Sequence, residues 1–351
     1  MNIFIVPIEP IDKRYTRQWH QNIPKLVTNY AKGEGIKVNV VNIDGTPIYD
    51  DISGGAFLDF ALTNKWKADQ VRKISEFFAN GSVKPGDRFL VTDAWNIVIT
   101  TIRCMSELLD IPVEIHGIWH AGHYDPSDIL GYKLSSEWPS HVERSWYHCC
   151  DYNYFGTEYH RNMFLKNLDI PEKYHYKAIR SGQPHDYIVP LLEPYDNLAK
   201  MDQIIWPHRC NSDKQPEIAE SLSIEYHMIL TQKQQIEKLS YYNILGVSKI
   251  LFSCSLHENL GISVMEGVLA GVIPVLPDRC SYTEMYAPEF LYPSEWTSSY
   301  DNFIKYRSEL IEFINHRMNY PEEYQQALID QKEKLIDHYL TSGIMLSKLV
   351  R

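Results

Sequence analysis

Several patterns that would restrict the function are missing from this chain of 351 residues. The six cysteines include no CxxC pair, which argues against a zinc ribbon or a dithiol redox site. The longest apolar tract, about 11 residues at 267–277, is far shorter than the ~20 residues of a transmembrane helix. The start, MNIFIVPIEP, lacks the basic head and apolar stretch of a signal peptide. We therefore expect a cytoplasmic protein with reduced thiols.

The chain also has fewer basic than acidic residues. Asp and Glu number 45 against 34 Lys and Arg, so the formal net charge is −11. Proteins that bind nucleic acid over much of their surface are normally basic, so such a contact here requires a local patch. Residues 1–185 carry 22 acidic and 20 basic side chains, whereas the remainder carries 23 and 14. The first half is therefore the less repulsive half for a polyanion.

Short apolar runs alternate with longer helix-like segments along the chain. The predicted strands cover 2–7, 38–43, 88–92, 112–118, 152–155 and 174–179, and then 202–206, 226–230, 250–253 and 272–276. Alternating strands and helices indicate an α/β fold with parallel sheets. Two such series predict two Rossmann-like domains, residues 1–185 and 186–351, and the second ends in a helical tail.

The segment SLHENLGISVMEG follows a predicted strand and leads into a predicted helix. It places Glu258 and Glu266 on either side of Gly261, where the backbone can approach a ligand closely. The N–H groups of Gly261, Ile262 and Ser263 would lie at a helix N-terminus, which suits a phosphate or carboxylate. The carboxylates would accept hydrogen bonds from sugar and ribose hydroxyls. The alternative is that both are surface charges favoured by the helix macrodipole.

Three polar residues, His208, Arg209 and Lys214, follow the first strand of the second series. Ligands of open α/β sheets bind at the carboxyl ends of strands. Two cations at that place could clamp a diphosphate and neutralise its developing charge. The alternative is an ordinary surface Arg and Lys that pair with Asp213.

Together, the two stretches resemble the retaining GT-B glycosyltransferases of family four, whose signature is two Glu separated by seven residues, with Arg and Lys upstream. The resemblance covers about residues 202–293 and is closest to the tRNA-queuosine mannosyltransferases; phage enzymes that glycosylate DNA bases share the architecture. It implies two Rossmann-like domains that face each other across a cleft, with a UDP- or GDP-linked sugar as co-substrate. In the family, the first Glu binds the donor sugar, the second the ribose, and the Arg and Lys the diphosphate. The residues implied here are Glu258, Glu266, Arg209 and Lys214, with His208 and Asn259 as further donor-binding residues.

A metal site is not expected. No two Asp lie two positions apart, so the DxD metal motif of GT-A enzymes is missing. The resemblance implies that cations and a helix dipole replace the metal, and we expect no cofactor. The tripeptide His148-Cys149-Cys150 has poor geometry for a metal, and buried thiols are the better interpretation.

The loop after the first predicted strand interleaves cations with aromatic residues. Lys13, Arg14 and Arg17 alternate with Tyr15 and Trp19, a combination that suits phosphates and stacked bases. We expect this loop to bind the acceptor. The alternative is a solvated helix start with Trp19 packed beneath it.

A second loop, after the strand 112–118, contains two histidines. The family often places a His here, against the donor sugar or near the acceptor, which implies His120 first, as a catalytic residue, and His123 second, near the acceptor. Asp93 follows the strand 88–92 and is a candidate for binding the acceptor hydroxyl. An Asx turn before Trp95 is the alternative.

We expect transfer of a sugar, with retention, to a hydroxyl on a modified nucleobase in DNA (a phage-type hydroxymethylpyrimidine) or tRNA. Two other interpretations stay open at this point. One is a glycosyltransferase of surface polysaccharide or glycolipid synthesis. The other is a sugar-nucleotide epimerase or an inactive sugar-binding module with the same fold.

Overall fold

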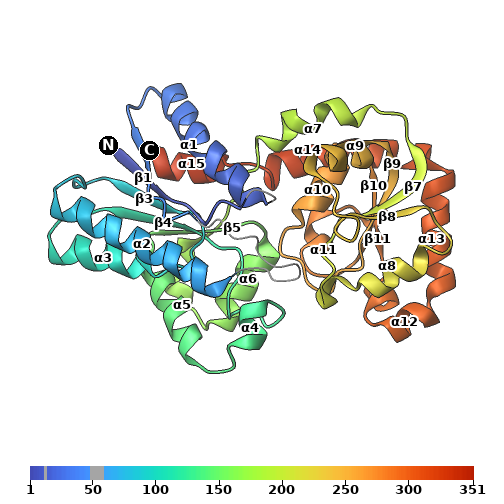
Figure 1. Ribbon diagram of the computed structural model, residues 1–351, viewed down its shortest axis with the longest axis horizontal. Helices are drawn as coiled ribbons and strands as arrows, with labels where there is room; N and C mark the ends of the chain where they lie inside the picture. The colour runs from blue at the N-terminus through green and yellow to red at the C-terminus, as the bar shows by residue number, and fades with distance from the viewer. Residues whose placement is uncertain (12–13, 48–58) are drawn as a thin grey trace. The chain divides into compact units, whose positions relative to one another are not determined.

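The computed structural model describes residues 1–11, 14–47 and 59–351. The chain forms two compact units, the first made of Met1–Pro184 with Thr341–Arg351 and the second of His185–Leu340 (Figure 1). The chain passes from the first unit to the second after Pro184, one residue before the predicted boundary after residue 185. The assignment of residues 341–351 to the second domain is wrong.

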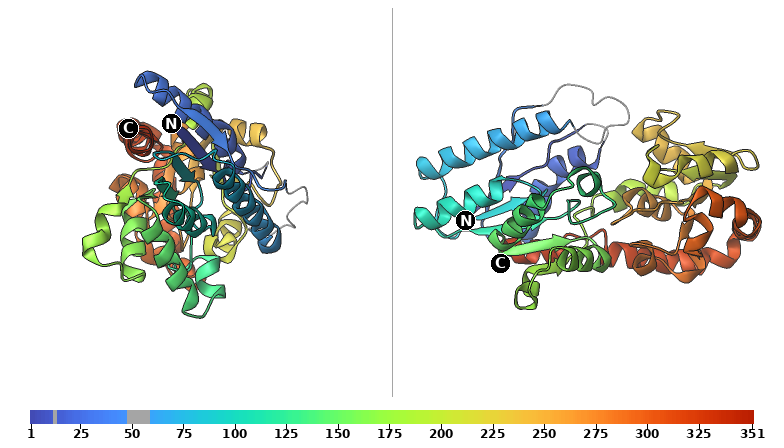
Figure 2. Two further views of the ribbon diagram at one scale, coloured as in Figure 1. Left: turned by 90° about the vertical axis from the view of Figure 1, so that its left-hand side faces the viewer. Right: turned by 90° about the horizontal axis from the view of Figure 1, so that it is seen from below.

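The reason is the last helix, α15 (Gly343–Val350), which packs against α1 (Tyr15–Gly33) in the first unit. Its buried side chains are those of Met345, Leu346, Leu349 and Val350. Both chain ends therefore belong to the first unit, where they lie near each other in every view (Figure 2).

The first unit contains a six-stranded parallel sheet in the order β2-β1-β3-β4-β5-β6. Its strands are β1 (Asn2–Val6), β2 (Asn39–Asn42), β3 (Arg88–Val91), β4 (Glu114–Ile118), β5 (Tyr152–Phe155) and β6 (Ala178–Arg180). The inner strands are buried on both faces, as expected for a parallel sheet covered by helices. Helices α1 and α15 lie on one face, and α2 (Phe60–Ala79), α3 (Val98–Leu108) and α5 (Trp138–Cys149) lie on the other (Figure 1). Two further helices are α4 (Ile129–Lys133) and α6 (Glu158–Asn167).

The sequence predicts a helix over 67–79 and a strand over 174–179, and the structure differs at both. Helix α2 begins at Phe60, because the Asp59 side chain caps it by accepting from the N–H groups of Ala61 and Leu62. The segment predicted as a strand over 174–179 is mostly a 3₁₀-helix, Glu172–Lys177, and the strand begins only at Ala178. In the described part of the chain, no helix is both long and apolar enough to cross a membrane.

The second unit contains a five-stranded parallel sheet in the order β11-β10-β9-β7-β8. Its strands are β7 (Met201–Trp206), β8 (Met228–Leu230), β9 (Ser248–Phe252), β10 (Ile273–Pro277) and β11 (Leu291–Tyr292). One core gathers α7 (Ile188–Asp196), α9 (Lys238–Val247), α10 (Ile262–Leu269), α11 (Tyr282–Met285) and α14 (Gln325–His338). A second core on the opposite face gathers α8 (Pro216–Leu222), α12 (Tyr300–Lys305) and α13 (Arg307–Asn319). Strand residues alternate between the two cores, with Ile205 in the first and Ile204 and Trp206 in the second.

Helix α10 lies very close to β9. A Cβ atom added to Gly267 would lie 2.3 Å from Leu251 Cδ1, so any larger residue here would force the Leu251 side chain to shift. Gly261, just before α10, has a φ of +76°, a left-handed conformation that glycine adopts without strain. These two glycines fix how the loop after β9 enters the helix.

Candidate functional site

The carboxyl ends of β7 and β9 adjoin because the two strands are parallel neighbours. The 3₁₀ turn Ser212–Lys214 follows β7 and carries Lys214, which is 6% exposed. Its Nζ atom lies 3.3 Å from Glu258 Oε2, 3.3 Å from Asp213 Oδ2, and donates to the carbonyl of His257. The structure therefore brings together Lys214 and Glu258, 44 positions apart in sequence, while also making the Asp213 pair of the alternative interpretation.

Two titratable groups at this edge, Glu258 and His208, have a pKa that their surroundings lower. Burial acts to raise the pKa of the Glu258 carboxyl, but neighbouring cations, with Lys214 foremost, outweigh it and hold that pKa below its usual range. Burial, with the charge of Lys214 beside it, lowers the pKa of His208 to about 3. His208 is therefore a neutral imidazole at working pH, and its buried Nε2 has no hydrogen-bond partner among the described residues.

The N-terminus of α10 adjoins the same carboxylate. Gly261 lies against Glu258, whose Cγ would be 3.3 Å from a Cβ on the glycine. The N–H groups of Val264 and Met265 donate to the Gly261 carbonyl, so the helix starts as the sequence predicted. The earliest amides of a helix have no intrahelical acceptor, which suits them to an anion. Ile262 and Ser263 are half-buried there.

The second carboxylate of the motif, Glu266, lies within α10 and is 4% exposed. Its Oε1 is 2.7 Å from Lys238 Nζ and accepts from the hydroxyl of Tyr242 (3.3 Å). The Lys238 ammonium lies over the rings of Tyr241 and Tyr242, 5.1 and 4.6 Å from their centroids. Sequence reasoning missed Lys238; a signal was its i, i+3, i+4 spacing with the two tyrosines on α9. Ribose binding by Glu266 stays a prediction.

Two other predicted donor residues lie in the same loops. Arg209 follows His208 and is half-buried, and Asn259 follows Glu258 and is half-buried. Their assigned roles, and those of Glu258 and Lys214 toward a ligand, stay predictions.

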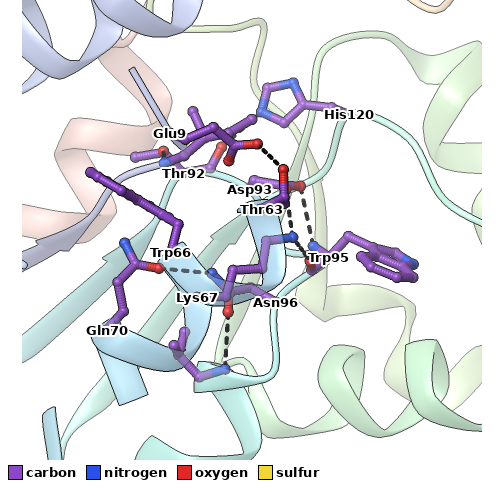
Figure 3. Close-up of polar contacts among 12 residues, drawn as sticks. Glu9, Thr63, Trp66, Lys67, Gln70, Thr92, Asp93, Trp95, Asn96 and His120 are labelled. Carbon is purple, nitrogen blue, oxygen red and sulfur yellow. Dashed lines mark hydrogen bonds and ion pairs between the residues drawn. The ribbon is translucent and has the colours of Figure 1, made fainter. Parts of the chain in front are cut away.

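In the first unit, the strands β1, β3 and β4 are parallel neighbours, so their carboxyl ends adjoin as well. Figure 3 shows the polar side chains that gather there. Asp93 Oδ1 accepts from the backbone N–H of Trp95 (3.3 Å), which confirms the Asx turn. Asp93 Oδ2 lies 3.3 Å from the ammonium of Lys67, a residue only 3% exposed that also donates to the Trp95 carbonyl (2.5 Å). Asp93 is thus committed to a turn and an ion pair.

The His120 ring lies near Thr92, the residue that follows β3 (Figure 3). Its Nε2 is 2.7 Å from the Thr92 carbonyl, which can only accept, so this nitrogen carries the proton. Burial lowers the pKa of the imidazole, and the neutral ring leaves Nδ1 to accept from the Gln183 amide (3.3 Å). Both ring nitrogens therefore have partners within the first unit, and a catalytic role for His120 stays a prediction.

The loop that carries His120 and His123 is held by Glu143 of α5, a fully buried residue. Glu143 accepts from the N–H groups of His123 (2.5 Å) and Tyr124 (3.1 Å) and from the indole of Trp95 (3.0 Å). Burial nevertheless raises the pKa of the Glu143 carboxyl to about 7. The His123 ring itself lies 3.2 Å from the Ser140 hydroxyl, and its acceptor role stays a prediction.

The aromatic residues of the first loop differ from the expectation. Trp19 is 1% exposed and its ring centroid lies 4.9 Å from that of His120, so a stacking role for it is wrong and the packed alternative holds. Tyr15 is half-buried, also against His120 (5.9 Å). Arg14 is half-buried and Arg17 is exposed at the start of α1, whereas Lys13 lies outside the described residues.

No group of three potential metal ligands occurs among residues 1–11, 14–47 and 59–351. Cys149 and Cys150 are free thiols, half-buried and buried, and burial raises the pKa of each. Cys150 is thus a buried thiol, as the sequence indicated, whereas Cys149 is only half-buried.

No protein-family model matches the chain. A tRNA-queuosine alpha-mannosyltransferase from Drosophila melanogaster is 24% identical over 123 residues, a match that covers 26% of this chain and 33% of that protein. This chain therefore matches only about a third of that relative's length.

Solved structures are similar over the whole chain. A sucrose-phosphate synthase from Thermosynechococcus elongatus has a TM-score of 0.61 at 11% identity, covering 99% of this chain and 97% of that one. The apo form of the lipopolysaccharide outer core galactosyltransferase WaaB has a TM-score of 0.56 at 11% identity, covering 100% and 99%. The two parallel sheets, their helices and these matches show that the chain has the GT-B fold of glycosyltransferases.

Proposed function

We propose that the protein is a retaining glycosyltransferase that moves a sugar from a nucleoside diphosphate donor to a hydroxyl on a modified nucleobase. The observation that carries this proposal is the contact between Lys214 and Glu258 beside neutral His208, at the N-terminus of α10. This edge combines a cation and helix amides for a diphosphate with a carboxylate for sugar hydroxyls.

The chemistry follows from where charge develops. When the glycosidic C–O bond breaks, the leaving diphosphate gains negative charge, so Lys214, Arg209 and the first amides of α10 bind it more strongly than they bind the intact donor. Glu258 orients the sugar through its hydroxyls, and His208 Nε2 supplies a hydrogen bond without adding charge. The acceptor hydroxyl attacks the anomeric carbon from the face that the diphosphate leaves, which retains the configuration. The diphosphate takes the proton of that hydroxyl, so neither a protein nucleophile nor a separate protein base is required.

Two observations support the nucleobase acceptor. Part of the chain is similar to a tRNA-queuosine mannosyltransferase, an enzyme named for a modified tRNA base. The first unit also places Arg14 and exposed Arg17 at the start of α1, close in sequence to the strand end of β1. The similarity to WaaB favours a second candidate, transfer to a lipopolysaccharide-type glycan.

The test is donor turnover with separate acceptors. The protein is incubated with UDP- and GDP-linked sugars, and release of the nucleoside diphosphate is measured. The acceptor arms are a single-stranded oligonucleotide with 5-hydroxymethylcytosine or 5-hydroxymethyluracil, tRNA that carries queuosine, and a lipopolysaccharide core oligosaccharide. We expect release to rise with one modified nucleic acid and not with its unmodified counterpart. Stimulation by the oligosaccharide alone would favour the second candidate, and no binding of any nucleotide sugar would contradict both.

A further inference from the structure

A glutamate just after β1 has a partner for only one of its two carboxylate oxygens. Glu9 is 2% exposed, and its Oε1 accepts from the hydroxyl of Thr63 on α2 (2.6 Å). The other oxygen, Oε2, is buried and has no hydrogen-bond partner in the part of the chain that the structure describes. Figure 3 shows the carboxylate beside Thr63 in the polar cluster of the first unit.

A buried carboxylate oxygen without a partner is costly, because it has lost its water and gained nothing in return. Lys67 lies one helical turn after Thr63, but its ammonium contacts Asp93 and the carbonyl of Trp95. The cation of this cluster is thus committed to another acid. The arrangement keeps Glu9 Oε2 available as a hydrogen-bond acceptor.

The position of Glu9 is where an α/β sheet binds its ligands. It follows β1, and the neighbouring Ile8 donates its N–H to Thr92 Oγ1 at the end of β3 (2.9 Å). The Thr92 carbonyl in turn holds the His120 ring after β4. The carboxyl ends of three adjacent strands therefore meet around Glu9, and each is fixed by a hydrogen bond.

We propose that Glu9 is an acceptor-binding residue whose Oε2 accepts a hydrogen bond from the hydroxyl group that receives the sugar. This inference rests on the proposed function and names the group that holds the second substrate. An ionised carboxylate has lone pairs and no proton to donate, so it selects a hydroxyl and repels a phosphate. The phosphates of a nucleic acid acceptor then bind elsewhere, and Glu9 contacts only the neutral reacting part.

The test compares Glu9→Gln with Glu76→Gln, a matched change at an exposed glutamate on α2. The full protein is assayed with its nucleotide sugar and the hydroxymethylated oligonucleotide, or with the acceptor that the preceding assay identifies. We expect kcat/KM for the acceptor to fall about 10–100-fold in Glu9→Gln, since one charge-assisted hydrogen bond is lost. Donor hydrolysis without acceptor and the calorimetric Kd for the nucleoside diphosphate should be unchanged, because those depend on the second unit.

Thermal unfolding without ligand separates this role from a structural one. If Oε2 is kept for a ligand, Glu9→Gln should be at least as stable as the parent protein. Thr63→Val, which removes the partner of Oε1, should lower Tm. Normal transfer in Glu9→Gln, or a transfer loss accompanied by a Tm as low as that of Thr63→Val, would overturn the inference. Failure of the parent protein to bind any nucleotide sugar would instead overturn the proposed function.

Discussion

The two units place a buried lysine against a carboxylate at the carboxyl edge of each sheet, but the surroundings differ. In the second unit, Lys214 faces both Glu258 and Asp213, next to a histidine that burial keeps neutral. In the first unit, Lys67 pairs with Asp93 and donates to the Trp95 carbonyl. Glu9 lies in the same cluster, and its Oε2 has no hydrogen-bond partner among the described residues. Under the proposed function, the edge of the second unit combines its cation with helix amides to bind an anion. Under the further proposal, the edge of the first unit uses Glu9 to bind a hydrogen-bond donor.

The largest effects should come from removing the two lysines. Lys214→Met and Lys67→Met should each lower the free energy of unfolding by about 2–4 kcal/mol, less than the loss of a fully buried pair, because each leaves a half-buried acid without its cation. Only Lys214→Met should also weaken nucleoside diphosphate binding and lower kcat, by roughly 10²–10³-fold. Denaturant unfolding and calorimetry measure the two effects. Lys233→Met, at an exposed pair with Glu220, is the control and should cost about 0–1 kcal/mol. Equal loss of nucleotide binding in both lysine variants would break the comparison.

The first unit should carry a pH dependence through Glu143. Its pKa is raised from 4.5 to about 7 in the folded protein, so between these values the folded state holds a proton that the unfolded chain releases. The free energy of unfolding should therefore fall as pH rises from 4.5 to 7, by about 3 kcal/mol, and level off above pH 7. Glu143→Gln should flatten this slope in denaturant unfolding measured across that range. An identical slope in the variant would show that other groups cause it.

A smaller effect is expected at the proposed ribose site of the second unit. Glu266→Gln should weaken nucleoside diphosphate binding by about 1.5–3 kcal/mol, the contribution of a hydrogen bond to a charged group. Lys238→Met, which removes the ammonium from the same carboxylate, should leave the carboxylate free to bind and change the affinity less. Calorimetry with UDP and GDP measures both variants. Unchanged affinity in Glu266→Gln would remove this residue from the donor site.

The smallest of these effects tests the packing that positions the donor loop. Gly267→Ala should cost about 1–3 kcal/mol, because its Cβ would collide with Leu251. Gly33→Ala, where a Cβ would meet nothing within 4 Å, is the control in the first unit and should be neutral or stabilising by up to about 1 kcal/mol. Thermal unfolding of the two variants gives the difference. Equal stabilities would mean that α10 can move away from β9 at no cost.

The sequence predicted the second edge better than the first for a physical reason. Glu258, Gly261 and Glu266 lie in one contiguous loop and helix, and parallel strands bring the residues after β7 beside them. Because ligand sites of α/β folds lie at the carboxyl ends of neighbouring strands, Lys214 could be placed near Glu258 from the sequence.

The cluster of the first unit comes instead from three distant segments. Glu9, Asp93 and the α2 residues Thr63 and Lys67 meet only because α2 packs across the strand ends, and no spacing along the chain encodes that contact. The burial of Trp19 could not be predicted for the same reason. Its place in the sequence fits a buried or an exposed ring, and only the packing of the folded chain decides between them. The docking of α15 was missed because an amphipathic helix does not specify which sheet it covers.

The docking of α15 on α1 has a consequence for biosynthesis. The chain leaves the first unit after Pro184 and returns to it at Thr341, so the first unit lacks part of its cover while residues 185–340 are translated. At roughly 5–20 residues per second, the ribosome needs on the order of ten seconds for that stretch. During this interval the α1 surface that α15 later covers is exposed to solvent. The order of synthesis thus makes the second unit the first that can complete its fold.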